Sequence, residues 1–143
     1  MIMFQAPKRR VDRVFIHCTA SDQSIAGIDL RDLIKGWHLE RKFNDIGYHF
    51  LIDKGGALLP GRDLEKTPAA QRGHNTGTIA ISVHGLESFT PVSMQTLRGL
   101  CGQINDAYSG RVSFHGYSEV SNKSCPVFDY RAQLQLDRFG RIA

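Results

Sequence analysis

The side chains of this chain that could do chemistry are histidines, tyrosines, a lysine and a cysteine at expected strand ends and in loops. Cys125 lies in a polar loop two residues after Lys123, whose ammonium would favour the thiolate that binds metal or attacks carbon. Together with two histidines, that thiolate would form a three-ligand zinc site with one open position, which is typical of catalytic zinc. The candidates are His17, Tyr48, His49, His74, His115, Tyr117, Lys123 and Cys125.

Two chemistries fit these residue types. One is a zinc hydrolase, and the other is a thiol hydrolase in which Cys125 is the nucleophile and a histidine is the base. A structural zinc site would need four protein ligands, usually closely spaced, and the sequence has no such cluster. Spacing alone leaves the choice between the two hydrolases open.

The hydrophobic pattern predicts the elements that must position these residues. Their order predicts an α/β fold, a mixed β-sheet flanked by helices, in one domain over 1–143 with a core of about 11–137. In the second strand, Tyr48, Phe50 and Ile52 are expected to share one face. The expected strands are 14–18, 46–53, 57–59, 79–83 and 112–115, and the expected helices are 30–41, 91–108 and 128–136.

Composition limits the function classes. No apolar run approaches the ~20 residues of a membrane span, and no apolar segment in residues 1–10 resembles a signal peptide, so synthesis in the cytoplasm without membrane insertion is expected. Three cysteines are too few and too scattered for a disulfide framework. The net charge of +4 is spread out apart from a basic cluster at 8–13, so no nucleic-acid partner is expected, and a monomer is the simplest state.

Several short motifs, taken in order, resemble the zinc-dependent N-acetylmuramoyl-L-alanine amidases, which share a fold with the peptidoglycan recognition proteins. The likeness is greatest to small phage endolysins of that type, and it runs from about residue 14 to 130. The matching pieces are Phe15 to Ala20, Trp37-His38, Gly47 to Phe50, Gly61-Arg62-Asp63, Gly73-His74-Asn75, Glu119-Val120 and Lys123 to Pro126.

The resemblance implies roles for individual residues. His17 and Cys125 match two zinc ligands, and the zinc would polarise the scissile carbonyl and hold the attacking water. Tyr48 matches a catalytic tyrosine that orients the water or the oxyanion. Lys123 matches a residue that supplies positive charge to the tetrahedral intermediate.

The same resemblance places two further residues beside the substrate. His74 and Asn75 match a loop that lines the substrate groove, where they would hydrogen-bond the peptide or sugar or else stabilise the loop. His38 and His49 are expected to be structural.

One position departs from the family pattern. Phage members commonly carry a histidine two residues before the acid that is Glu119 here, and this chain has Tyr117 there. His115 could ligate instead, since residues 115 and 117 of an extended segment face the same side, but it lies ~6.6 Å away along the chain. Alternatively the Tyr117 phenolate ligates, or zinc binds weakly or not at all.

The sequence therefore predicts an enzyme that hydrolyses the amide bond between N-acetylmuramic acid and L-alanine in peptidoglycan, with Zn²⁺ as cofactor. A phage or prophage endolysin would reach the wall after membrane permeabilisation. The alternative role is that of a cytoplasmic enzyme that recycles wall fragments. The alternative from another class is a non-catalytic peptidoglycan-binding domain, which Tyr117 favours.

Overall fold

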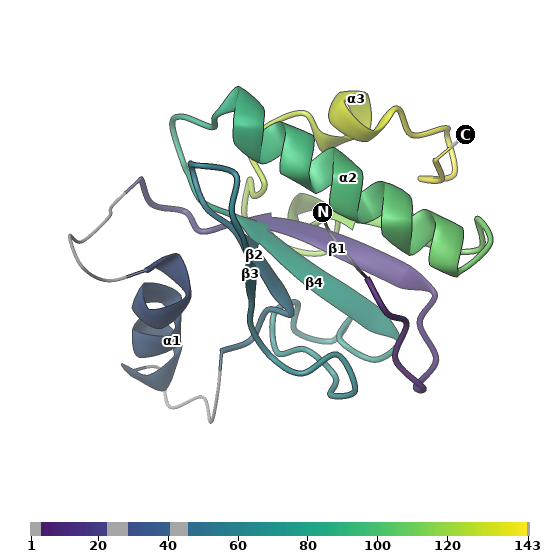
Figure 1. The fold of residues 1–143 in the computed structure, drawn as a ribbon, viewed down its shortest axis with the longest axis horizontal. Coiled ribbons are helices and arrows are strands. Elements are labelled where there is room, and N and C mark those ends of the chain that lie inside the picture. Colours follow the sequence, from purple (N-terminus) through teal and green to yellow (C-terminus); the bar gives the residue numbers. More distant parts are fainter. Residues whose placement is uncertain (1–3, 23–28, 41–45, 143) are drawn as a thin grey trace.

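The computed structural model describes residues 4–22, 29–40 and 46–142, in which a five-stranded sheet carries helices (Figure 1). The strands are β1 (Arg13–Cys18), β2 (Phe50–Ile52), β3 (Leu58–Pro60), β4 (Thr78–Val83) and β5 (Ser113–Gly116). The helices are α1 (Leu30–Glu40), α2 (Pro91–Ala107), the 3-10 helix η1 (Tyr117–Glu119) and α3 (Tyr130–Leu134).

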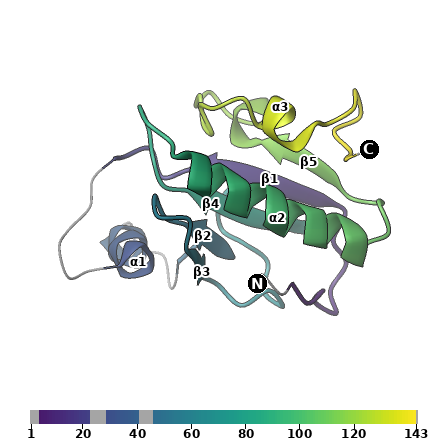
Figure 2. The same cartoon turned by 45° about the horizontal axis from the view of Figure 1, so that its top comes forward.

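The strand order in the sheet is β3-β2-β4-β1-β5. Strand β4 pairs in parallel with β1 and β2, β5 pairs in parallel with β1, and only the β2–β3 hairpin is antiparallel. Helix α2 lies across one face, α3 lies near β5, and α1 stands beside the β2–β3 edge (Figure 2). The predicted mixed sheet flanked by helices is confirmed.

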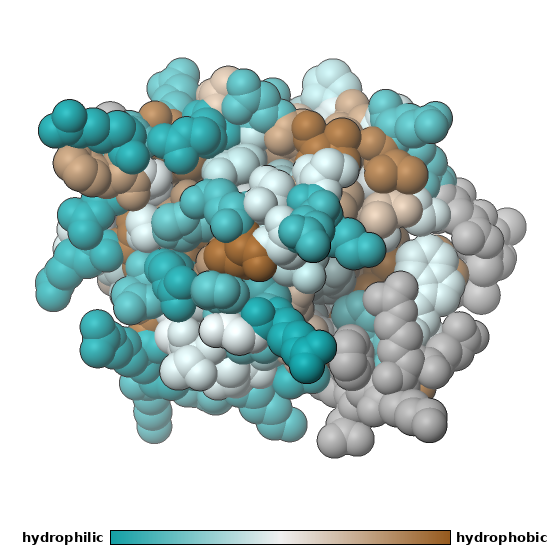
Figure 3. All heavy atoms as spheres, turned by 180° about the vertical axis from the view of Figure 1, so that it is seen from behind, coloured by the Kyte–Doolittle hydropathy of each residue, from teal (hydrophilic) through white to brown (hydrophobic). Residues whose placement is uncertain are grey.

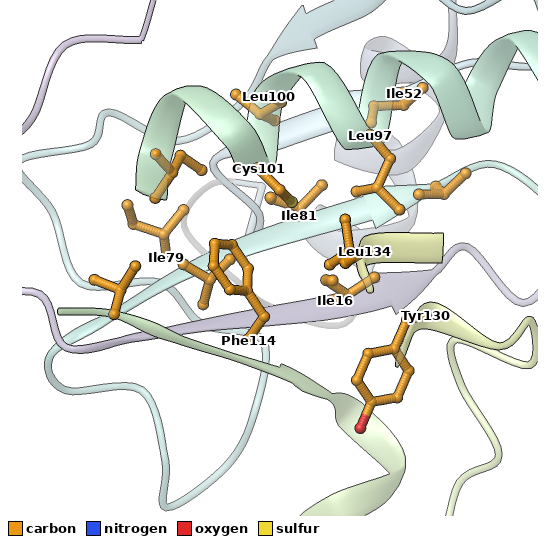
Figure 4. Packing of buried hydrophobic residues seen from close by; sticks show 14 of the residues in the cluster. Ile16, Ile52, Ile79, Ile81, Leu97, Leu100, Cys101, Phe114, Tyr130 and Leu134 are labelled. Atoms are coloured by element: carbon orange, nitrogen blue, oxygen red, sulfur yellow. The ribbon is translucent and has the colours of Figure 1, made fainter. Parts of the chain in front are cut away.

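The larger core lies between α2 and the sheet. Alternate residues of β1, Val14 and Ile16, are fully buried in it, and α2 contributes a stripe with helical spacing (Figure 4). Thr90 caps α2, since its hydroxyl oxygen accepts a hydrogen bond from the Ser93 amide at 3.1 Å. The α2 stripe consists of Met94, Leu97, Leu100, Cys101 and Ile104.

Helix α1 builds a second, smaller core on the other side. Its Leu30 and Ile34 pack with Ile46 and Leu51, and Trp37 packs against them while only partly buried. The expected cap is present: the amide of the third helical residue donates to the Asp29 carboxylate at 2.9 Å. The expected end of the helix at Arg41 lies outside the described residues.

The second strand is shorter than predicted, because β2 begins only at Phe50. Before it, the carbonyls of Tyr48 and His49 both accept bonds from consecutive amides after β3, and a Cβ on Gly61 would lie 2.2 Å from the Tyr48 oxygen. This irregular pairing breaks the alternation. Tyr48 therefore packs with the Leu51 cluster and not on the Phe50 face, as the pattern had predicted.

The last helix is also shorter than the predicted 128–136. Asp129 caps it, accepting a bond from the Ala132 amide at 3.1 Å, and Gln135 ends it in a left-handed conformation with φ of 52°. No helix among the described residues is long and apolar enough to cross a bilayer.

Candidate active site

The parallel pairing of β1 with β5 builds the centre of the site. Ile16 of β1 is the register partner of Gly116 of β5, so the residues that follow them, His17 and Tyr117, are neighbours. The centroids of their rings lie 4.5 Å apart, with 31° between the ring planes, and the centroid of the Tyr48 ring lies 5.1 Å from that of His17. His17 is thus held among aromatic rings on the face of the sheet opposite α2.

A chain of hydrogen bonds fixes the imidazole of His17. The Thr78 hydroxyl donates to the Asn75 carbonyl at 2.7 Å, so its oxygen accepts from the Gln71 amide nitrogen, also at 2.7 Å. The Gln71 oxygen must then face His17, whose Nε2–H donates to it at 2.8 Å. This arrangement leaves the lone pair of His17 on Nδ1.

Burial sets the charge of two histidines. It lowers the pKa of His17 to about 4, although the bond to Gln71 acts in the opposite direction. Burial likewise lowers the pKa of His49 to about 4. His49 is structural, because its Nδ1 accepts from the Ala80 amide at 3.1 Å and its Nε2–H donates to the Lys66 carbonyl at 2.8 Å.

His38 joins α1 to the site. Its Nδ1 accepts from the Gly47 amide at 2.8 Å, and its ring lies 5.3 Å from that of Tyr48. This bond holds the helix against the segment that carries Tyr48, which agrees with the structural role expected for His38.

A pocket of about 540 Å³ opens beside these rings. Its charged lining comes from Arg72 and Lys123, and no carboxylate is among the described residues that line it. The surface seen from behind Figure 1 is mostly hydrophilic, with small separated apolar areas over the described residues (Figure 3). The other lining residues are His17, Cys18, Thr19, Ala20, His38, Tyr48, Ala69, Ala70, Gly73, Asn75, Tyr117 and Cys125.

The two residues expected to bind substrate differ in position. Asn75 lines the pocket, but its side-chain oxygen accepts bonds from the amides of Ala70 and Gln71 at 3.1 and 2.9 Å, which stabilises the loop. His74 is absent from the described lining, and its amide donates to the carbonyl of Gln71.

His115 lies one step away from the site. It is the register partner of Phe15, its Nε2 lies 2.6 Å from the Ser113 hydroxyl, and its Nδ1 lies 3.1 Å from Glu119. Burial alone would raise the pKa of Glu119, but hydrogen bonds from Tyr130 and His115 lower it below its usual value. His115 is therefore outside the described pocket lining, with both ring nitrogens in contacts.

The two site cysteines are joined. Cys18 and Cys125 form a disulfide across 107 residues, with Cα atoms 5.5 Å apart, while Cys101 is free and lies on the buried face of α2. The scattered cysteines had predicted no disulfide framework, and one bridge does form because the fold brings the end of β1 beside the last loop.

As bonded here, the donor set does not fit zinc. Cys125 has no thiolate to offer, and the position of the expected third ligand carries the Tyr117 phenol. Within the described part of the chain, no group of three histidine, cysteine or acidic side chains could hold a metal ion.

Sequence reasoning missed Gln71, Arg72 and Cys18. Cys18 carried a signal, since it directly follows a candidate ligand. Arg72 and Gln71 carried none, because polar residues in a polar loop have many roles, and only the fold shows that Gln71 meets His17.

Comparison with solved structures first identifies the class of fold. The structure of the amidase LysC from Clostridium intestinale matches with a TM-score of 0.78 at 21% identity, covering 95% of this chain and 96% of that one. Drosophila PGRP-LB, a peptidoglycan recognition protein, matches with a TM-score of 0.69 at 21% identity, covering 85% of this chain and 78% of its own. The fold is that of the amidases and peptidoglycan recognition proteins.

Sequence comparison then gives the family. Residues 7–128 match the family described as N-acetylmuramoyl-L-alanine amidase, and the chain belongs to it. The endolysin of Escherichia phage T7 is 33% identical over 132 residues, which cover 87% of this chain and 85% of the relative. The predicted family, fold and enzyme class are confirmed.

Proposed function

We propose that this chain is an endolysin that hydrolyses the amide bond between N-acetylmuramic acid and L-alanine in peptidoglycan. The observation that carries the proposal is the pocket in which Tyr48 and Lys123 lie with an ordered, neutral His17. The family match over 7–128 and the likeness to phage endolysins over most of the chain support the same reaction.

The pocket residues suit amide hydrolysis. Attack of water forms a C–O bond at the lactyl carbonyl, places negative charge on its oxygen, and breaks the C–N bond as the amine of L-alanine takes a proton. Lys123 supplies positive charge where the oxyanion develops. The Tyr48 hydroxyl orients the water or the oxyanion, and Arg72 favours the carboxylates of the stem peptide.

Zinc is the cofactor that the family resemblance implies. No step above depends on it, because Cys125 is bonded to Cys18 and position 117 is a tyrosine. The candidates for a third zinc ligand were His115 and Tyr117. The contacts of both His115 ring nitrogens with Ser113 and Glu119 argue against His115. We also propose that His74 and Asn75 contact the substrate.

The site of action follows from the reaction. The substrate is the bacterial wall, so the chain acts there after synthesis in the host cell, and we propose that it does so as a monomer. A non-catalytic peptidoglycan-binding domain is the second candidate, and Tyr117 is the observation that favours it.

The test is a digest of purified peptidoglycan by reduced protein with added zinc, read by mass spectrometry. Stem peptides that begin at L-alanine would support the amidase. Saturable muropeptide binding without release, both in the natural chain and in Tyr117→His, would support the binding domain instead.

Lys123→Ala tests the role of the lysine. Loss of one group that stabilises an oxyanion lowers kcat by roughly 10²–10³-fold, whereas muropeptide binding is expected to change little. Lys66→Ala is the matched control, since Lys66 is exposed and absent from the pocket lining. Equal loss of binding and turnover in Lys123→Ala would contradict a role confined to the oxyanion.

A further inference from the structure

We propose that Arg9 is a positioning residue for the substrate pocket, because its guanidinium bonds to both ends of the 64–78 segment, which forms one wall of that pocket. The expected effect of Arg9 on substrate affinity rests on the proposed function. Its expected effect on the order of the 64–78 segment does not, since that order is measured without substrate.

Arg9 differs from Arg10, its neighbour in the basic cluster at 8–13. The Arg10 side chain is 88% exposed and lies 3.7 Å from the Asp12 carboxylate, a surface ion pair that contributes little to stability. Arg9 is only partly exposed, and its guanidinium bonds to backbone carbonyls that are distant in the sequence. The two arginines are therefore adjacent in the sequence and differ in their structural surroundings.

The guanidinium of Arg9 joins the start of the 64–78 segment to the sheet. Its Nε–H donates to the Leu64 carbonyl at 2.6 Å, and its Nη2 donates to the carbonyl of Thr78, the first residue of β4, at 2.8 Å. Both hydrogen bonds are charge-assisted, and a planar guanidinium holds its donors in a fixed fork. Arg9 therefore fixes the distance between the two carbonyls, which the ammonium of a lysine on its flexible stem would not do.

The 64–78 segment depends on such bonds for its position. No helix or strand lies between β3 and β4, so contacts with other segments must hold this part of the chain. The Lys8 amide donates to the Glu65 carboxylate at 2.9 and 3.1 Å, and the His49 ring donates to the Lys66 carbonyl at 2.8 Å. These bonds support the start of the segment, whereas the bonds of Arg9 reach both of its ends.

The segment held in this way supplies the wall of the pocket that carries Arg72, the cation proposed to attract the carboxylates of the stem peptide. Tyr48 and Lys123 come from other parts of the chain, and Gln71 keeps its own bond to the Thr78 hydroxyl. Loss of the Arg9 contacts is therefore expected to weaken substrate binding more than the chemical step. The segment contributes Ala69, Ala70, Arg72, Gly73 and Asn75 to the pocket lining.

The experiment compares full-length Arg9→Lys and Arg9→Ala with the natural chain. It measures KM and kcat for the release of stem peptides, and the dissociation constant of the free stem peptide, which has no scissile bond left. Arg9→Lys keeps the charge and loses the fork, so KM and the dissociation constant are expected to rise about 10-fold, the population change that one charge-assisted hydrogen bond supports. The kcat is expected to change little, and Arg9→Ala is expected to raise KM further.

Amide hydrogen exchange separates local order from overall stability. The amides of Ala70 and Gln71, which donate to the Asn75 side chain, are expected to exchange about 10-fold faster in Arg9→Lys, while amides within α2 keep their rates. Arg10→Lys and Arg10→Ala are the matched controls and are expected to change neither exchange nor KM. Circular dichroism verifies the fold of each variant, and Arg9→Lys decides the test if Arg9→Ala unfolds.

Natural KM and natural stem-peptide affinity in the folded Arg9 variants would overturn the role of Arg9, whatever the exchange rates. A loss of kcat larger than the rise in KM would also overturn it, because Arg9 would then affect the chemical step rather than binding. If the natural chain neither releases nor binds stem peptides, while Arg9→Lys still speeds exchange at Ala70 and Gln71, the proposed function is rejected and the structural effect of Arg9 on the segment stands.

Discussion

The two faces of the sheet are built from the same strands but have different roles. Val14 and Ile16 of β1 face α2 and are buried among apolar side chains, whereas His17, which alternates with them, faces the pocket. His17 is buried as completely as they are, yet it is held by an oriented hydrogen bond. Burial of apolar side chains stabilises the fold but does not fix how a side chain is oriented. Burial of a hydrogen-bonded polar side chain fixes its orientation, but it costs desolvation free energy.

The cost of polar burial predicts how stability depends on pH. The pKa values of His17 and His49 are lowered to about 4 in the folded chain, so between pH 6.5 and 4 the unfolded chain binds more protons. Stability is therefore full above about pH 6.5 and falls as the pH drops toward 4, by roughly 6 kcal/mol in total. Urea unfolding of the metal-free chain across this range measures it.

His49→Asn gives the control for that experiment. The asparagine can accept the Ala80 bond but does not titrate, so about half of the pH dependence is expected to vanish. A profile unchanged by this substitution would show that folding does not lower the pKa of His49.

Leu97→Ala tests the α2 face. Leu97 is fully buried, and its truncation leaves a cavity, so the free energy of unfolding is expected to fall by about 3 kcal/mol. Gln95→Ala on the exposed side of the same helix is expected to change it little. Muropeptide affinity is expected to be unaffected, and a large loss of affinity would mean that the two faces are coupled.

Gln71→Leu tests the pocket face. It leaves the buried Nε2–H of His17 without an acceptor, which costs about 2 kcal/mol. It also frees the imidazole to change tautomer, which nitrogen NMR shifts report and a loss of packing would not produce. Gln133→Leu, which removes the contact with Arg98, is the control. An unchanged tautomer would show that Gln71 does not orient the ring.

Val127 is a small test at the edge of the pocket loop. It has a φ of 72°, which is costly for a β-branched residue, and its side chain is 47% exposed. Val127→Gly is expected to stabilise the chain by about 1 kcal/mol, measured by thermal unfolding. Lower stability would mean that the valine packs favourably enough to outweigh its backbone.

The sequence predicted the apolar face better than the polar one. Hydrophobic spacing identified α2 and β1, because each residue contributes by its own type and period. The order of motifs found His17 and Tyr48, but the face of Tyr48 was wrong, since irregular pairing before β2 breaks the alternation. Gln71 was missed because its role depends on a partner 54 residues away.

The Cys18–Cys125 bond also turns most of the chain into a covalent ring, with α3 on a short tail beyond it. A protease that cuts once at exposed Arg72 would open the ring without releasing a fragment. The nicked protein would migrate as one species in a denaturing gel and separate into two after reduction. Such a gel reads the redox state of the site directly from the connectivity of the polypeptide.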